Sequence, residues 1–146
     1  MLDLVFQNYT STKAPTEQFF IKIFEVATEA LNLKNKVELS VNLVGDNKIR
    51  ALNKRHRNKN KVTDVLSFPL EEKKLEKYGI LPLGDIFICL PFAKKEAKSE
   101  NVSIDRKLAQ LAVHGFLHLL GYDHERSGKD ADEMFRLENK ILDKLT

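Results

Sequence analysis

The feature that most constrains the fold is that apolar residues recur with two different periods in successive segments of the chain. Alternation of apolar and polar residues indicates a strand, whereas apolar residues three and four apart indicate a helix. Strand patterns lie near residues 2–6, 37–43, 64–68 and 83–90, and helical patterns separate most of them. The interleaving predicts an α+β protein with a small, mixed, four-stranded sheet.

About five helices are expected around this sheet. The first is predicted to begin at Ala14-Pro15-Thr16, because proline is tolerated in the first turn of a helix. Further helix signals are a capping Asp46, Pro91 in a first turn, a capping Ser103 and a terminating Gly121. A last helix is marked by apolar residues at three-to-four spacing: Met134, Leu137, Ile141, Leu142 and Leu145.

Length and composition favour one domain, residues 1–146, in a reducing compartment. A chain of 146 residues fits one core, and its net charge of +3 is too mild to indicate a partner. Cys89 is the sole cysteine and lies in an apolar run, which predicts a small buried side chain. No signal peptide or membrane-spanning stretch is visible, so we expect a soluble, cytoplasmic protein without a membrane partner.

Three of the four histidines fall within eleven residues, at the spacing His-x3-His-x5-His. His114 and His118 are four apart on a predicted helix, so their rings project from one face. Gly121 would let the chain turn back and bring His124 to the same ion. Three imidazoles suit Zn²⁺ and leave a fourth position for water, which is typical of catalytic rather than structural zinc. The sequence predicts one zinc per chain, on a helix and the turn that follows it.

This spacing matches that of metzincin peptidases except at one place. Those enzymes carry a general-base glutamate beside the first histidine, where this chain has Gly115. A peptidase of that type would lack its proton acceptor. A metal alone can still lower the pKa of bound water to about 7. The spacing therefore predicts metal binding and leaves peptidase chemistry as an alternative.

A basic stretch without acidic residues runs from Lys48 to Lys61. Clustered cations are the electrostatic footprint of proteins that bind a phosphate backbone, although a solvated face without a partner is an equal alternative. The stretch leads into Thr63 to Pro69, where a guanidinium at the edge of a cleft could hold a phosphate. His56 is expected to be solvated rather than a ligand. Four cations are assigned as tentative RNA contacts: Lys54, Arg55, Lys59 and Lys61.

Two aspartates are assigned as tentative supports of the metal site. Asp85 is an acid in an apolar segment, which favours a structural role or the orientation of a ligand. Asp123 precedes His124 and could accept an imidazole N–H, or could equally stabilise the turn.

Three segments together resemble the YbeY family of bacterial ribosomal-RNA maturation endoribonucleases. The segments are Leu52-Asn53 through Arg57 and on to Thr63-Asp64-Val65-Leu66-Ser67-Phe68-Pro69, then Gly84-Asp85-Ile86, then His114 to His124. Their order, their spacing and the chain length match the family from end to end. The resemblance implies that His114, His118 and His124 bind zinc and that Arg57 is the family's important arginine near the metal.

The resemblance also implies an activity. The family cuts single-stranded RNA, helps mature the 3′ end of small-subunit ribosomal RNA and takes part in ribosome quality control. We therefore expect a zinc-dependent endoribonuclease with ribosomal RNA, and with the small subunit or its proteins, as partners. The alternatives are a metzincin-like zinc peptidase and a non-catalytic, zinc-stabilised ribosome-assembly factor. Asn60 and Val62 depart from the family pattern, in which aspartate and proline are usual, and put the rigidity of the loop after Arg57 in question.

Overall fold

The computed structural model describes residues 2–70, 78–123 and 128–145. The charged run 71–77, which we expected to be an exposed excursion, lies outside these residues. The described chain forms four strands and five helices, as predicted for an α+β domain. In chain order they are β1 Leu2–Asn8, α1 Glu17–Ala30, β2 Lys36–Val44, α2 Asp46–Arg57, β3 Val65–Pro69, β4 Ile80–Cys89, α3 Leu90–Glu100, α4 Ile104–Leu119 and α5 Gly128–Leu145.

The four strands form one mixed sheet in the order β1-β2-β4-β3. β1 and β2 are parallel, as are β2 and β4, while β3 runs antiparallel to β4 at the edge. The register pairs Ser67 with Ile86 and Phe68 with Asp85. Because successive side chains of a strand point to opposite faces, Ser67 and Ile86 share one face and Phe68 and Asp85 share the other.

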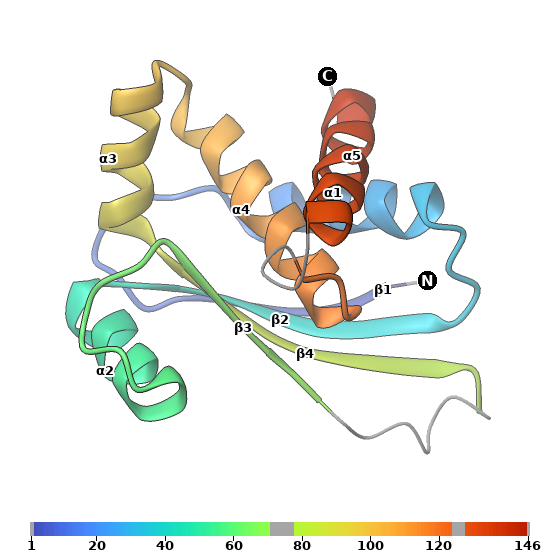
Figure 1. Cartoon of the computed structure of the whole chain (residues 1–146), viewed down its shortest axis with the longest axis horizontal. Helices are drawn as coiled ribbons and strands as arrows, with labels where there is room; N and C mark the ends of the chain where they lie inside the picture. The colour runs from blue at the N-terminus through green and yellow to red at the C-terminus, as the bar shows by residue number, and fades with distance from the viewer. Residues whose placement is uncertain (1, 71–77, 124–127, 146) are drawn as a thin grey trace.

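The main core lies between the sheet and three helices. α1, α4 and α5 cover one face of the sheet, and α4 lies between α3 on one side and α5 on the other (Figure 1). Phe24 of α1 packs against Phe116 of α4, with ring centroids 5.4 Å apart. Ile86 and Ile88 of β4 are fully buried beneath the same helices. α4 is therefore packed against the sheet and the neighbouring helices over most of its surface. This packing fixes the direction of the side chains on its remaining face.

The opposite face of the sheet carries α2 and a small second cluster. Ile49 of α2 packs there with Leu66, Cys89 and Val44. The Cys89 thiol is buried, as predicted, and donates to Asp46 Oδ1 at 3.2 Å. Burial is the main cause that raises its pKa from 9.0 to about 12. This thiol is an inert core group, and the cluster anchors α2 against the sheet.

Two predicted helix starts are wrong. Pro15 precedes α1 rather than lying in its first turn, because Thr16 has an extended backbone and is the residue before the helix. Asp46 does not cap α2. The extended Gly45 occupies that position, and its carbonyl accepts from the Ile49 N–H at 3.1 Å. Asp46 is instead the first helical residue, where its charge favours the positive end of the helix dipole.

The two predicted ends of α4 are confirmed. Ser103 accepts the Arg106 N–H at 3.0 Å and so caps the helix. At the other end, Gly121 has a φ of +102°. The Gly121 and Tyr122 N–H groups donate to the His118 and Leu117 carbonyls, which closes the last turn and reverses the chain. Among the residues described, no helix is long and apolar enough to cross a membrane.

Candidate active site

An open cavity of about 530 Å³ lies where the end of α2, strand β3 and the last turns of α4 meet. It brings together residues that are far apart in the sequence. Its lining consists of Arg57, Thr63, Asp64, Val65, Leu66, Ser67, His114, His118 and Asp123. Three side chains predicted for the site, Arg57, His114 and His118, therefore line one cavity.

His114 and His118 lie one turn apart on α4, as their spacing predicts. The centroids of the two imidazole rings are 4.7 Å apart, and both side chains are partly buried. His124, the third predicted ligand, lies outside the described residues. Within the described part of the chain, no group of three histidine, cysteine or acidic side chains is placed to hold a metal ion. The two imidazoles fit a zinc site that one further ligand from the segment after Asp123 would complete.

His114 makes a contact that the sequence analysis did not predict. Its Nδ1 atom forms a hydrogen bond with Oε1 of Glu138, on α5. The two side chains are 26% and 20% exposed, so the pair is largely shielded from water. Glu138 follows Met134 by four residues and precedes Ile141 by three. An acid on the apolar stripe of a predicted helix was the signal that could have identified it.

Arg57 is the last residue of α2 and is exposed at the edge of the cavity. The loop that follows is held by the buried Asn53, whose Nδ2 donates to the Lys61 carbonyl at 3.0 Å. The Asn53 carbonyl also accepts the Lys59 N–H. Val62 packs against the second cluster, while Asn60 is exposed. The loop is thus fixed by contacts that need neither of the usual residues at positions 60 and 62.

The four cations assigned to RNA lie around the C-terminal end of α2. Lys54, Arg55, Lys59 and Lys61 are all exposed, and none lines the cavity. Cations also favour the negative end of a helix dipole, so their position has a structural explanation as well. His56 contacts Phe68, with ring centroids 4.8 Å apart, and does not line the cavity. These four side chains could therefore contact a bound polymer outside the cavity, but not a group bound inside it.

Gly115, beside the first histidine, faces the sheet rather than the cavity. A Cβ atom at this position would lie 3.0 Å from Ser67 Oγ and 3.0 Å from Ile86 Cγ2. Ser67 Oγ also donates to the Gly115 carbonyl at 3.2 Å. A side chain here would require Ser67 and Ile86 to shift, because α4 approaches β3 and β4 closely. A glutamate at this position, as metzincins carry, would begin toward the sheet rather than toward the cavity.

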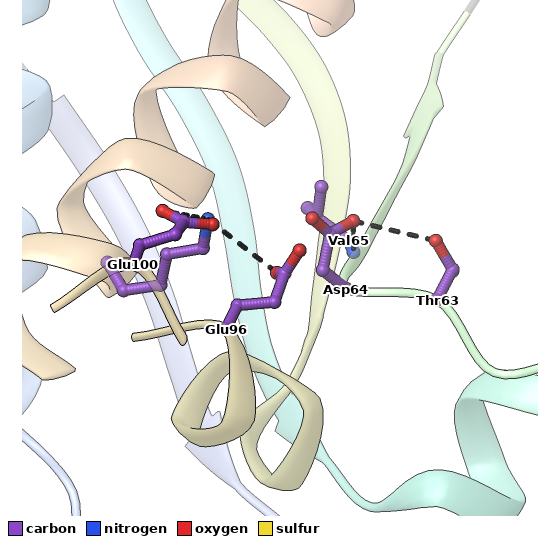
Figure 2. A network of polar contacts seen from close by, with 6 residues as sticks. Thr63, Asp64, Val65, Glu96 and Glu100 are labelled. Carbon is purple, nitrogen blue, oxygen red and sulfur yellow. Dashed lines mark hydrogen bonds and ion pairs between the residues drawn. The ribbon is translucent and has the colours of Figure 1, made fainter. Parts of the chain in front are cut away.

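A network of acids adjoins the cavity at Asp64. The Asp64 carboxylate accepts from the Val65 N–H at 2.7 Å, and Glu96 of α3 lies between Asp64 and Glu100 (Figure 2). The buried Lys107 Nζ is 2.8 Å from Glu100 and 3.7 Å from Glu96. Burial, followed by the charge of Asp64, raises the pKa of Glu96 from 4.5 to about 7. The network joins α3, α4 and the start of β3 behind the cavity.

The two aspartates predicted to support the metal are placed differently. Asp123 lines the cavity with His114 and His118. Asp85 lies on the sheet face opposite α4, is exposed, and accepts a hydrogen bond from Ser40 of β2. Asp85 therefore ties β4 to β2 and is not brought to the histidines. Asp64, which the sequence analysis did not assign, lies in the cavity instead.

Comparisons with known proteins agree with this fold and find relatives along most of the chain. A protein of Sulfurihydrogenibium named endoribonuclease YbeY is 47% identical over 135 residues, which covers 92% of this chain and 87% of the relative. One from Oenococcus oeni with the same name is 49% identical over 124 residues, covering 84% and 81%. The solution structure of TM1509 from Thermotoga maritima matches with a TM-score of 0.63 and 28% identity, covering 97% and 87% of the two chains.

These relatives place the chain among the nucleases, a class of hydrolases. The family model described as endoribonuclease YbeY matches residues 5–146. The chain belongs to the YbeY endoribonuclease family.

Proposed function

We propose that this protein is a zinc-dependent endoribonuclease that cuts single-stranded RNA in the cytoplasm. We further propose that it acts in maturation of the 3′ end of small-subunit ribosomal RNA and in ribosome quality control. The observation that carries the proposal is that Arg57 lines the same cavity as His114 and His118, two imidazoles that could bind a metal. A cation that can grip a phosphate and two imidazoles that can hold a metal are the two parts that such a reaction needs.

The metal would be held by His114 and His118, together with His124 from the segment beyond the described residues. When bound, zinc supplies Lewis-acid activation of water or of a phosphate oxygen at neutral pH. The α4 helix keeps the two imidazoles one turn apart on one face, so little rearrangement is needed to bind the ion. Asp123, two residues after the Gly121 turn, lines the same cavity as the two imidazoles.

Arg57 would hold the scissile phosphate from the opposite side of the cavity. Its planar guanidinium can donate two parallel hydrogen bonds to phosphate oxygens and can stabilise charge that develops on them. The exposed Lys54, Arg55, Lys59 and Lys61 would follow the neighbouring RNA backbone, or ribosomal RNA in the small subunit. The open side of the cavity suits a strand that passes through it, because a single strand can thread where a closed pocket would exclude it.

The packing of Gly115 disfavours the peptidase alternative. A metzincin-type base at this position would begin toward the sheet, where even a Cβ atom crowds Ser67 and Ile86. Structural zinc is usually four-coordinate, and the cavity around the two imidazoles is open, which disfavours a purely structural site.

Purified protein incubated with labelled single-stranded RNA and with casein, each with and without a chelator, tests the proposal. We expect RNA to be cut, the chelator to abolish cleavage, and casein to remain intact. Chelator-sensitive proteolysis without RNA cleavage would overturn the proposal in favour of the peptidase. An absence of both activities in zinc-loaded protein would favour the assembly factor.

A further inference from the structure

The hydrogen bond between His114 and Glu138 joins the first histidine of the site to a different helix. α5 is anchored against the core by the buried Met134, Ile141 and Leu142, which flank Glu138 on the helix. Packing therefore fixes the part of α5 from which Glu138 projects toward His114. Glu138 does not line the cavity that holds His114, His118 and Arg57, but lines two smaller hollows on the α5 side of His114.

A carboxylate accepts hydrogen bonds and cannot donate them, so it selects the imidazole form that carries a proton on Nδ1. In the neutral ring, that form leaves Nε2 with a free electron pair. A histidine that binds a metal commonly gives its other N–H to a carboxylate, which fixes the ring and raises the basicity of the ligating nitrogen.

We propose that Glu138 is a positioning residue that holds His114 in the Nδ1-protonated form, so that Nε2 is the nitrogen that would bind the metal. This inference rests on the proposed zinc site, and it adds a partner from α5 that lies outside the histidine motif. Because the carboxylate already restricts the His114 ring, fewer orientations and tautomers of this ring are lost when the ion binds. A change at Glu138 should therefore weaken zinc binding without removing a ligand.

Glu138→Gln is the informative variant, because it keeps the shape of the side chain but removes its charge. An amide can either donate or accept, so it no longer selects one form of the ring. Glu133→Gln is the matched control, since it removes the same charge from the same helix, and Glu133 lines none of the hollows around His114. Both full-length variants can be compared with the wild type by circular dichroism to confirm that they fold.

Two measurements test the inference. Zinc affinity is measured by competition with a chromogenic chelator, and the tautomer of His114 is measured by ¹⁵N NMR on zinc-free protein at about pH 8, where an ordinary imidazole is neutral. We expect Glu138→Gln to bind zinc about 10–100-fold more weakly, as is typical when such a partner is lost. We also expect it to lose the preference for the Nδ1–H form, and Glu133→Gln to match the wild type in both.

Wild-type zinc affinity in Glu138→Gln would overturn the inference while leaving the zinc site intact. Weaker zinc binding with an unchanged His114 tautomer would also overturn it, and would indicate that Glu138 is itself a ligand. Wild-type protein that takes up no zinc would overturn the proposed zinc dependence and this inference together. Because neither measurement depends on RNA cleavage, a failure of this inference can be distinguished from a failure of the proposed function.

Discussion

At the scale of single residues, the proposed reaction depends on Arg57 and the two cavity histidines. Arg57 comes from the end of α2, while His114 and His118 come from α4, and the fold brings them to one cavity. A guanidinium differs from an ammonium in its planar fork as well as in its hydration. The geometry of the group at position 57 is therefore as important as its charge.

Arg57→Lys should reduce RNA cleavage by about 100-fold or more, since preorganised donors to a transition-state oxygen are typically worth that much. Zinc content and thermal stability should not change, because Arg57 is exposed and belongs to no core cluster. Initial cleavage rates at saturating RNA provide the measurement. Lys54→Arg is the matched control. It makes the reverse exchange, from lysine to arginine, at an exposed residue outside the cavity. Equal rates for Arg57→Lys and wild type would show that the fork has no role.

The histidines of α4 could be predicted because helical spacing alone places residues 114 and 118 on one face. Glu138 and Asp64 were missed for the same physical reason. Their proximity to His114 depends on how α5 and β3 pack against α4, and no local pattern encodes that packing. Asp85 was assigned only as a tentative support of the metal site, and its apolar neighbours favoured a structural role. The strand alternation turns it to the other face of the sheet, where it accepts a hydrogen bond from Ser40.

At the scale of elements, the close approach of α4 to the sheet determines what position 115 can carry. The helix touches β3 through the hydrogen bond from Ser67 to the Gly115 carbonyl and touches β4 through Ile86. A side chain at position 115 would therefore meet Ser67 and Ile86 of the sheet before it could reach the cavity.

Gly115→Glu should destabilise the protein by roughly 3 kcal/mol or more, because it combines overpacking with a buried, unpaired carboxylate. For a chain of this size, such a loss lowers Tm by roughly 10 °C. Differential scanning calorimetry on zinc-free protein measures this, with the half-buried Gln110→Glu on the same helix as control. A Tm within a degree or two of wild type would show that the helix can move away from the sheet at little cost.

Helix periodicity gave the positions of all five helices, but two of their starts were wrong because competing residues lay side by side. Gly45 and Asp46 are both acceptable before a helix, and the extended backbone at Gly45 decides between them. Thr16 similarly excludes Pro15 from α1. The strand order β1-β2-β4-β3 could not be read from the sequence either, because it depends on pairing between distant segments.

Across the whole molecule, the acid network of Asp64, Glu96, Glu100 and Lys107 links the back of the cavity to α3 and α4. Glu96 is the member whose pKa is raised, to about 7. A carboxyl group whose pKa is higher in the folded state favours folding when it is protonated. The stabilisation of the folded state by this group is fully present below its ordinary pKa of 4.5, and it is lost as the pH rises through about 7.

Glu96→Gln should therefore flatten the dependence of stability on pH. The Tm of the wild type should fall more between pH 5 and pH 8 than the Tm of the variant, because the glutamine stays neutral throughout. Thermal unfolding at several pH values measures the difference between the two curves, and Glu133→Gln controls for the loss of a carboxylate elsewhere. Parallel curves for Glu96→Gln and wild type would contradict the raised pKa.

The most direct test of the account is zinc content and RNA cleavage measured on the same preparations of wild type and His118→Ala. If the cavity is a zinc-dependent ribonuclease site, wild type should carry about one zinc per chain, as expected for a three-histidine site. Chelation should abolish its cleavage of single-stranded RNA, and added zinc should restore it. His118→Ala should remain folded but lose both zinc and cleavage. Full zinc occupancy or wild-type cleavage in His118→Ala would contradict the account.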